Sequence, residues 1–399
     1  MSGERHPSAL IRIGSALLVG PDLMPIRSAA LFFVSSFTTL SCATTPPPPP
    51  ASPNTAAPFV SARAIETEEH DVEFHDVRFR DGQVLPAVRI HYSTAGTPRR
   101  DASGRITNAV LMLHWTGSSS DVLQSRAYAD TLYGSGRPLD LSRYYLVFID
   151  DVGHGRSSKP SNGLRASFPP YGYEDIVTLQ YRTVTEALHL EHLHAIVGLS
   201  MGGMNAWQWA ERYPDFMDAI IPIVALPAPI SGRNLIWRRF VALSIRNDPS
   251  WSGGNYTTPP RGWTESFPVF RMLLDGVPHL HQTVRDRAAA DAFIRDASTA
   301  ATRMDANDLL YALEASGDYD PSRELERIRA RVFALNFSDD AFNPVELGIL
   351  EESMRRVPHG TFVIQPGTPH SFGHFTQAHP ELWAPRIGEF LQALEGAAP

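Results

Sequence analysis

Short hydrophobic runs alternate along this chain with segments in which hydrophobic residues recur every three or four positions. The short runs are typical of β-strands, which we expect at residues 72–79, 87–92, 109–114, 145–149, 195–199, 219–223, 332–337 and 361–365. Segments with helical spacing lie between several of them, at residues 173–190, 203–213, 345–356 and 382–394. Strands that alternate with helices indicate an α/β fold built on a mostly parallel, doubly wound sheet.

The segment between the strands expected at residues 219–223 and 332–337 is roughly a hundred residues long, far more than an ordinary connection. Helical patterns occur in it at residues 238–246, 286–296 and 305–315, and residues 248–262 are loop-like. A helical insertion of this kind often covers a binding site at the edge of a sheet. We therefore expect a helical cap over about residues 227–322, inserted into one domain that spans residues 60–399.

The chain begins with a segment that does not fit the α/β pattern. Residues 28–40 form an apolar run too short to span a bilayer, preceded by Arg27 and followed by Ser41 and Cys42. This order resembles a bacterial lipoprotein signal, in which the cysteine is lipidated and becomes the mature N-terminus. Residues 1–43 are therefore interpreted as a leader with lipidation at Cys42. An ordinary cleaved signal peptide and an unstructured leader are the alternatives.

A proline-rich linker follows the leader at residues 44–59. It holds seven prolines and no charged residue, a composition that favours an extended, semi-rigid tether. Such a tether suits a folded domain held to a membrane through Cys42, so we expect a protein exported to the periplasmic side of a bacterial membrane. Met24 gives the signal a more compact charged start than Met1 does, and it is the predicted true start.

Composition narrows the possible partners and cofactors. Hydrophobic residues make up 43% of the 399 residues, enough for a large core, and the net charge of −8 comes without clustered basic runs, so a nucleic-acid partner is not expected. A single cysteine excludes an intrachain disulfide and a cysteine metal site, and Lys159 is the sole lysine. His154, His279 and His281 lack the H-E-x-x-H pattern and are interpreted as solvated loop histidines. We therefore expect neither a metal ion nor a cofactor.

The clearest chemical motif is G-x-S-x-G, formed by Gly198-Leu-Ser200-Met-Gly202. It follows a strand pattern and precedes a helical one, which is the context of a nucleophile elbow. Small residues on both sides of the serine permit the tight turn that presents its hydroxyl, so Ser200 is the predicted nucleophile. The glycine-rich loop at residues 150–157 lacks the G-x-G-x-x-G spacing of a dinucleotide site and is interpreted as a structural loop at the rim of the site.

An activated serine needs a base to take its proton and an acid to orient that base. In hydrolases with this elbow, the acid and then the histidine follow the nucleophile, each after a late strand. The strand expected at residues 332–337 is followed by two candidate acids, Asp339 and Asp340. The strand expected at residues 361–365 is followed by two candidate bases, His370 and His374. The spacing to a following proline favours Asp340 over Asp339, and the glycine–histidine pair favours His374 over His370.

The reaction also needs backbone donors for the oxyanion that forms during attack. One should be the amide of Met201, directly after the nucleophile. The other should come from the turn after the strand expected at residues 109–114, where Thr116 or Trp115 is the candidate donor. The indole of Trp115 could equally pack against the acyl pocket.

These motifs resemble those of the α/β-hydrolases and, more narrowly, of the homoserine O-acetyltransferase branch of that superfamily. The matching stretches are Phe168-Pro169 with Asp175-Ile-Val-x-x-Gln180, Gly198 to Met204 with Trp209-Ala and Tyr213-Pro-Asp215, Arg246 to Tyr256, and Arg303-Met-Asp305-Ala-Asn307. They extend over most of residues 105–390. The resemblance implies an α/β-hydrolase fold with a helical cap and acyl chemistry at Ser200.

Three features depart from the transferases that the chain resembles. They carry an aspartate directly after the catalytic histidine, where this chain has Phe375; the resemblance implies that this aspartate helps to hold the amino acid substrate. Their cap arginine, which pairs with the substrate carboxylate, has only a displaced counterpart in Arg271. Their G-S-T-G-P loop is replaced by residues 153–158.

These departures, together with export away from cytosolic acetyl-coenzyme A, favour water as the acyl acceptor. We expect a serine hydrolase that acts on a small-molecule acyl ester. A homoserine O-acetyltransferase-like enzyme that uses acetyl-coenzyme A is the alternative. A third hypothesis is a surface-anchored binding module without catalysis.

Overall fold

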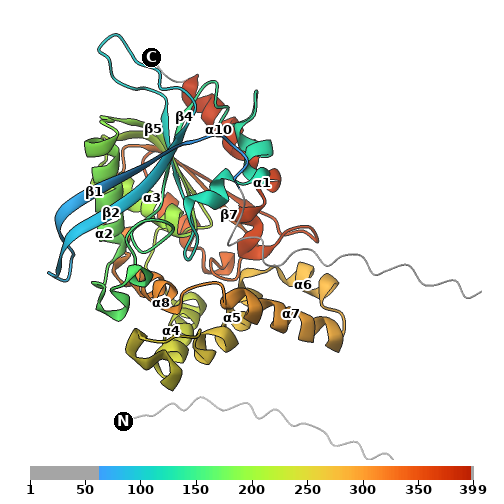
Figure 1. Cartoon of the computed structure of the whole chain (residues 1–399). Coiled ribbons are helices and arrows are strands. Elements are labelled where there is room, and N and C mark those ends of the chain that lie inside the picture. The colour runs from blue at the N-terminus through green and yellow to red at the C-terminus, as the bar shows by residue number, and fades with distance from the viewer. Residues whose placement is uncertain (1–62, 397–399) are drawn as a thin grey trace, which may run out of the picture. The chain divides into compact units, whose positions relative to one another are not determined.

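The computed structural model describes residues 63–396 and is built around one eight-stranded sheet (Figure 1). The order of the strands is β1-β2-β4-β3-β5-β6-β7-β8. They are β1 (Glu68–Arg78), β2 (Val84–Ala95), β3 (Ala109–Leu113), β4 (Tyr145–Ile149), β5 (Leu193–Leu199), β6 (Met217–Ile223), β7 (Arg331–Phe337) and β8 (Gly360–Gln365). Every strand that the hydrophobic runs predict is present, with ends that differ by up to a few residues.

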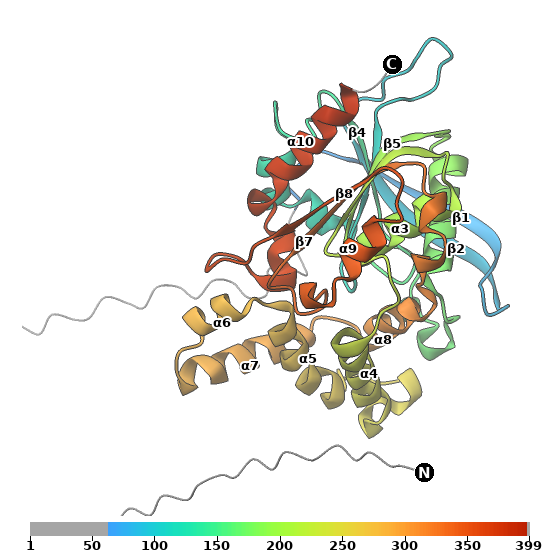
Figure 2. The ribbon, with the colours of Figure 1, turned by 180° about the vertical axis from the view of Figure 1, so that it is seen from behind.

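Helices cover both faces of this sheet (Figures 1 and 2). They are α1 (Arg126–Tyr128), α2 (Tyr173–Arg182), α3 (Met201–Arg212), α4 (Gly232–Arg246), α5 (Arg261–Leu274), α6 (Val277–Thr283), α7 (Arg287–Ala301), α8 (Ala306–Glu314), α9 (Ile349–Met354) and α10 (Ala384–Glu395). α2, α3 and α9 contribute to the core on one face, and α1 and α10 to the core on the other. Leu111 and Leu113 point into the first core and Val110 and Met112 into the second, which explains why the strand is apolar throughout.

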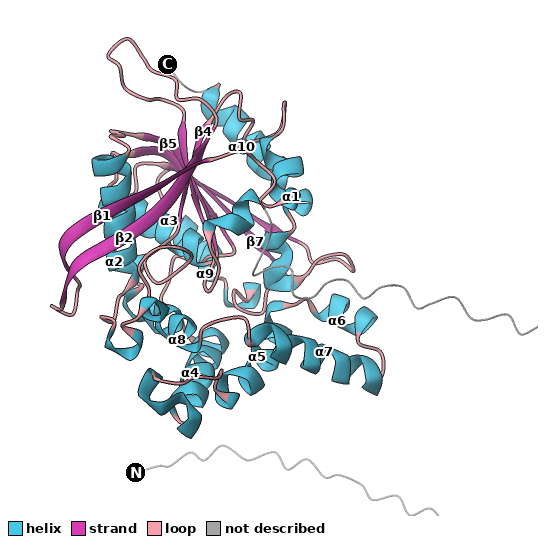
Figure 3. Cartoon of the chain, viewed as in Figure 1, coloured by secondary structure: helices cyan, strands magenta, loops and turns pink. Residues whose placement is uncertain are grey.

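The pairing of the strands places three chain segments at one edge of the sheet. Pairing is parallel from β4 through β3, β5, β6 and β7 to β8. β1 and β2 form an antiparallel hairpin, and β2 also pairs antiparallel with β4 (Figure 3). The predicted mostly parallel, doubly wound sheet is confirmed. Because parallel strands end at the same edge, the residues that follow β5, β7 and β8 meet there.

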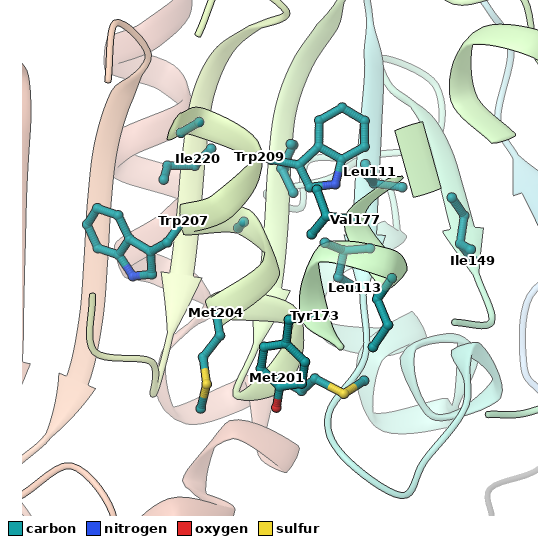
Figure 4. Packing of buried hydrophobic residues seen from close by; sticks show 14 of the residues in the cluster. Leu111, Leu113, Ile149, Tyr173, Val177, Met201, Met204, Trp207, Trp209 and Ile220 are labelled. Atoms are coloured by element: carbon teal, nitrogen blue, oxygen red, sulfur yellow. The ribbon is translucent and has the colours of Figure 1, made fainter. Parts of the chain in front are cut away.

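Helix α3, which follows β5, is fixed to the sheet by large buried side chains (Figure 4). Trp207 and Trp209 have no exposed surface. The indole Nε1 of Trp209 donates to Gln180 Oε1 at 2.7 Å, and that of Trp207 donates to the Ala225 carbonyl at 3.2 Å. Both buried donors are therefore satisfied. This anchoring fixes the N-terminus of α3 and Ser200 directly before it.

Helices α4 to α8 form a separate layer below the sheet in Figure 1, with a hydrophobic core of their own. The hydrophobic pattern did not predict α5 and α6. α5 contains Pro268, a residue that normally marks a helix end. The predicted loop at residues 248–262 holds instead a short 3₁₀ helix over Pro249–Gly254 and the first residues of α5.

Three of the features predicted from the sequence lie outside the described residues. They are the predicted leader, the lipidation site Cys42 and the proline-rich linker. Within residues 63–396, no helix combines the length and the apolar character needed to cross a membrane. Export and lipidation therefore stay predictions.

Candidate active site

Ser200 lies between β5 and α3 in a strained backbone conformation. Its φ and ψ angles are 53° and −109°, a combination that residues other than glycine rarely adopt. A Cβ on Gly198 would lie 2.1 Å from the Gly202 carbonyl oxygen, and one on Gly202 would lie 2.4 Å from the Leu113 carbonyl oxygen. Both positions of the motif therefore require glycine. The turn has the local geometry of a nucleophile elbow.

His374 connects Ser200 to Asp340. Its Nε2 lies 2.9 Å from Ser200 Oγ, and its Nδ1 lies 2.8 Å from Asp340 Oδ2. All three side chains are buried. When Nδ1 donates to the carboxylate, Nε2 is free to accept the serine proton. The structure thus brings together the three favoured residues, from the segments after β5, β7 and β8.

The two alternative residues lie in the same loops but point to other partners. Asp339 Oδ2 accepts hydrogen bonds from Ser371 Oγ at 2.7 Å and from the Gly373 amide at 3.2 Å. It therefore holds the loop that carries His374. His370 is exposed. The imidazole that contacts Ser200 therefore belongs to His374 and not to His370. The carboxylate that contacts this imidazole belongs to Asp340 and not to Asp339.

Asn343 belongs to the same site, although no motif indicated it. Its Nδ2 donates to Asp340 Oδ2 at 2.7 Å and to the Val224 carbonyl at 2.9 Å. The amide of Phe342 donates to Asp340 Oδ1 at 2.8 Å. These bonds orient the carboxylate towards His374. The spacing of three residues between Asp340 and Asn343 in a tight turn was the available sequence signal.

The candidate oxyanion donors lie on two segments that are hydrogen-bonded to each other. The Gly202 amide donates to the His114 carbonyl at 3.0 Å, which ties the start of α3 to the turn after β3. Within the described part of the chain, the amides of Met201, Trp115 and Thr116 form no backbone hydrogen bond outside regular elements. They are therefore available to donate to a developing oxyanion.

A buried polar cluster supports the turn that carries Trp115 and Thr116. His114 Nδ1 lies 2.9 Å from the Trp115 carbonyl oxygen, and His114 Nε2 lies 3.7 Å from Asp151 Oδ2. Burial raises the pKa of Asp151. His154, whose ring centroid lies 5.2 Å from that of His114, is also buried, and burial lowers its pKa to about 3. The prediction that His154 is a solvated loop histidine is wrong, because its side chain is buried beside His114.

A narrow cavity of about 20 Å³ lies beside Ser200, between the sheet and the helical layer. A volume of this size has room for one or two water-sized groups. Five aromatic side chains and one buried arginine contribute to its lining: Trp115, Trp237, Phe270, Phe342, Phe375 and Arg238. Trp115 thus lines the cavity, as its alternative role in the acyl pocket requires. The narrow cavity suits a small acyl group.

Phe375 and Arg271 contact each other next to His374. The guanidinium carbon of Arg271 lies 4.3 Å from the centroid of the Phe375 ring, and its Nη1 lies 3.4 Å from Asp275 Oδ2. Asp275 Oδ1 also lies 2.8 Å from Nδ1 of His279. His279 belongs to helix α6, so the prediction that it lies in a solvated loop is wrong. Burial lowers the pKa of Arg271, and the charge of Asp275 opposes that effect. Arg271 is therefore engaged within the helical layer.

Comparisons with known proteins agree with this fold. Residues 108–371 match the family model described as alpha/beta hydrolase fold. A probable acyltransferase from Methanothermobacter thermautotrophicus is 29% identical over 268 residues, which cover 67% of this chain and 81% of that protein. A homoserine O-acetyltransferase from Haemophilus influenzae is 31% identical over 312 residues, which cover 67% of this chain and 82% of that protein.

Solved structures give the same result for the fold. The crystal structure of an acetylester hydrolase from Corynebacterium glutamicum matches with a TM-score of 0.71 at 21% identity, covering 83% of this chain and 96% of that one. At this level of identity the likeness concerns the fold. The matched family model, the sheet and the nucleophile elbow support the same assignment, and the similarity to the homoserine O-acetyltransferase narrows it. The chain belongs to the α/β-hydrolase fold family, in the branch of the homoserine O-acetyltransferases.

Proposed function

We propose that this protein is a serine esterase that hydrolyses small carboxylic esters through an acyl-enzyme. The observation that carries this proposal is the hydrogen-bonded chain from Ser200 through His374 to Asp340, next to a narrow aromatic cavity. A serine hydroxyl alone is a weak nucleophile, and this arrangement supplies both the base and the group that orients it. An intact site of this kind argues for catalysis over binding alone.

The proposed reaction has two halves. Ser200 Oγ attacks the ester carbonyl while His374 Nε2 takes the hydroxyl proton, and the amides of Met201 and of Thr116 or Trp115 donate to the oxyanion. Collapse breaks the bond to the alcohol oxygen, which receives the proton from His374 and leaves. Water then attacks the acyl-Ser200 with His374 as base, and the carboxylic acid is released.

Water is favoured as the acceptor over homoserine by the contacts around Phe375. The aspartate that the resemblance implies for amino acid binding is replaced by this apolar ring. Arg271, the displaced counterpart that the resemblance implies for the carboxylate-binding arginine, lies against the ring and beside Asp275. A homoserine molecule would leave its ammonium group without an acidic partner, which is costly in a buried site. Export, which we also propose from the leader sequence, would separate the enzyme from cytosolic acetyl-coenzyme A.

Transfer of an acetyl group from acetyl-coenzyme A to homoserine is the second candidate function. The specific observation in its favour is the 31% identity to the Haemophilus influenzae homoserine O-acetyltransferase, which extends over most of that protein. The two functions share the first half-reaction and differ in the acceptor. They are therefore separated by the product formed.

The test measures which acceptor the acyl-enzyme uses. With p-nitrophenyl acetate, we expect a burst of p-nitrophenolate followed by steady release with one acetate per turnover. With acetyl-coenzyme A and homoserine, we expect no O-acetylhomoserine above background. Faster formation of O-acetylhomoserine than of acetate would identify a transferase. A protein inert towards short esters and towards a fluorophosphonate probe would exclude both functions.

Phe342 is predicted to limit the length of the acyl chain. Its ring stacks on Trp237 at 5.1 Å and meets the His374 ring edge-on at 5.0 Å between centroids. Phe342 and Asn234 line both the cavity beside Ser200 and a second cavity of about 400 Å³. We expect Phe342→Ala to join the two cavities and to raise the ratio of kcat/KM for p-nitrophenyl octanoate over acetate at least tenfold, because each newly buried CH₂ contributes about 0.8 kcal/mol.

The control for this prediction is Phe362→Ala, which removes a partly exposed ring on β8. It should leave the ratio as in the wild type. Phe342→Leu should give an intermediate ratio. If Phe342→Ala lowers activity on both esters equally, Phe342 positions His374 and does not limit chain length.

A further inference from the structure

We propose that Arg238 binds a carboxylate carried by the ester substrate, in a subsite that it forms with Tyr173 and Thr116 beside Ser200. The inference rests on the proposed esterase function and names its substrate class, a small ester that carries a carboxylate on its acyl or its alcohol part. Arg238 lies on α4, and Arg238, Thr116 and Ser200 line the same cavity. The subsite is separate from Arg271, which is held by Phe375 and Asp275.

The surroundings of Arg238 contain neutral acceptors. The side chain is buried; its Nε donates to Asn234 Oδ1 at 2.9 Å, and its Nη1 lies 3.3 Å from Ser316 Oγ and 3.5 Å from the Leu313 carbonyl oxygen. The last two distances are at the outer limit of hydrogen bonding. No carboxylate of the described residues forms an ion pair with Arg238. A buried guanidinium stays protonated, so neutral acceptors leave its charge uncompensated.

The groups next to Arg238 are further donors. The hydroxyl groups of Tyr173 and Thr116 and the indole Nε1 of Trp115 are buried; the indole has no hydrogen-bond partner, and the two hydroxyls lie near each other and near Arg238 without a well-aligned hydrogen bond. Burial raises the pKa of Tyr173, while the charge of Arg238 and the hydroxyl of Thr116 oppose that rise. Buried donors without acceptors are rare in folded proteins and costly.

This combination matches the chemistry of a carboxylate. A carboxylate supplies a negative charge and two oxygens that can each accept more than one hydrogen bond, and it pairs with guanidinium in a planar, bidentate geometry. A neutral acyl chain would leave the same donors without acceptors. The subsite therefore selects for an anionic substrate, and the position of Arg238 in the wall of the Ser200 cavity limits the carboxylate to a site close to the ester bond.

The experiment compares esters that differ only in a carboxylate and a carboxamide, kept small because the cavity is narrow. Acetoxyacetate against acetoxyacetamide tests a carboxylate on the alcohol part. Monomethyl malonate against methyl malonamate tests one on the acyl part. We expect the wild type to favour the carboxylate at least tenfold in kcat/KM in one of these pairs, and the pair that shows the preference identifies the side of the ester.

Substitutions then assign the preference to Arg238. Arg238→Met should reduce the ratio to about one, and Arg238→Lys should keep part of it because the charge remains. Tyr173→Phe, which removes one hydroxyl and keeps the ring, should lower it severalfold through a higher KM. Arg239→Met is the matched control on the same helix, since Arg239 is exposed and pairs with Glu314 at 3.3 Å. It should leave the ratio unchanged.

The other outcomes would overturn either the carboxylate subsite or the esterase function. Equal rates for carboxylate and amide in both pairs, with the wild type active, would overturn the subsite and leave the esterase function intact. Inactivity on every ester would instead count against the esterase function. If Arg238→Met does not fold, inhibition of the wild type decides: malonate should compete with substrate at least tenfold better than malonamide, and equal inhibition would overturn the proposal.

Discussion

Ser200→Ala should reduce kcat for p-nitrophenyl acetate by roughly 10⁵-fold, to a level close to the uncatalysed rate with some residual acceleration. The hydroxyl that forms the acyl-enzyme is lost, and so are the burst and the reaction with a fluorophosphonate probe. His374 and Asp340 remain but have no proton to move from a nucleophile. Stopped-flow measurement of p-nitrophenolate release checks both the burst and the steady rate.

The folded state should change little in this variant. Ser200 Oγ is hydrogen-bonded to His374 Nε2. The backbone conformation of the elbow is set by the glycines at positions 198 and 202 rather than by this hydroxyl. Alanine also tolerates the positive φ poorly, as serine does, so the strain is unchanged. Ser135→Ala, in an exposed loop, is the matched control and should keep full activity. A Ser200→Ala protein that still shows a burst would exclude Ser200 as the nucleophile.

The sheet and the residues that follow its strands were predictable because their signals are local. The run before Ser200 is apolar in consecutive positions, since both faces of β5 are covered, and G-x-S-x-G marks the turn that follows. Asp340 and His374 could be placed because each follows a strand that could itself be recognised. Parallel pairing then brings the strand ends together without further information.

The residues that the sequence did not reveal depend on contacts between distant segments. Arg238 and Tyr173 are 65 positions apart by residue number, and only the folded chain brings them near each other. Neither belongs to a motif. Helix α5 was hidden by Pro268, which disfavours a helix locally but is tolerated where Trp263, Phe267 and Phe270 bury one side of the helix.

The burial of His154 was missed for a similar reason. Its loop is rich in glycine and polar residues, a composition typical of exposed loops. In the structure, Asp150 accepts hydrogen bonds from the amides of Ser120 and Arg156 at 2.7 and 2.8 Å, which folds the loop inward. The acceptor and one of its donors are 30 positions apart, so no local pattern could indicate this contact.

Asp340→Asn should lower kcat/KM for p-nitrophenyl acetate by about 10⁴-fold, whereas Asp339→Asn should lower it by less than about tenfold. Asp340 Oδ2 lies 2.8 Å from His374 Nδ1 and receives Nδ2 of Asn343 at 2.7 Å, so an amide at this position faces one donor too many. Its nitrogen would take the place of Oδ2, facing His374 Nδ1 and Asn343 Nδ2, or the place of Oδ1, facing the Phe342 amide. In the first case His374 carries its proton on Nε2, where it cannot accept the serine proton. The negative charge that stabilises the imidazolium is also lost.

Asp339 gives the matched comparison because it is the adjacent aspartate and is also hydrogen-bonded. Its partners, Ser371 Oγ and the Gly373 amide, belong to the loop that carries His374, so its loss should move the imidazole slightly without changing its tautomer. Asp339→Asn should therefore raise KM or lower kcat modestly and keep the fluorophosphonate reaction. The reverse result, a loss of about 10⁴-fold in Asp339→Asn with an active Asp340→Asn, would assign the acid to Asp339 and show that the loop after β7 adopts another conformation during catalysis.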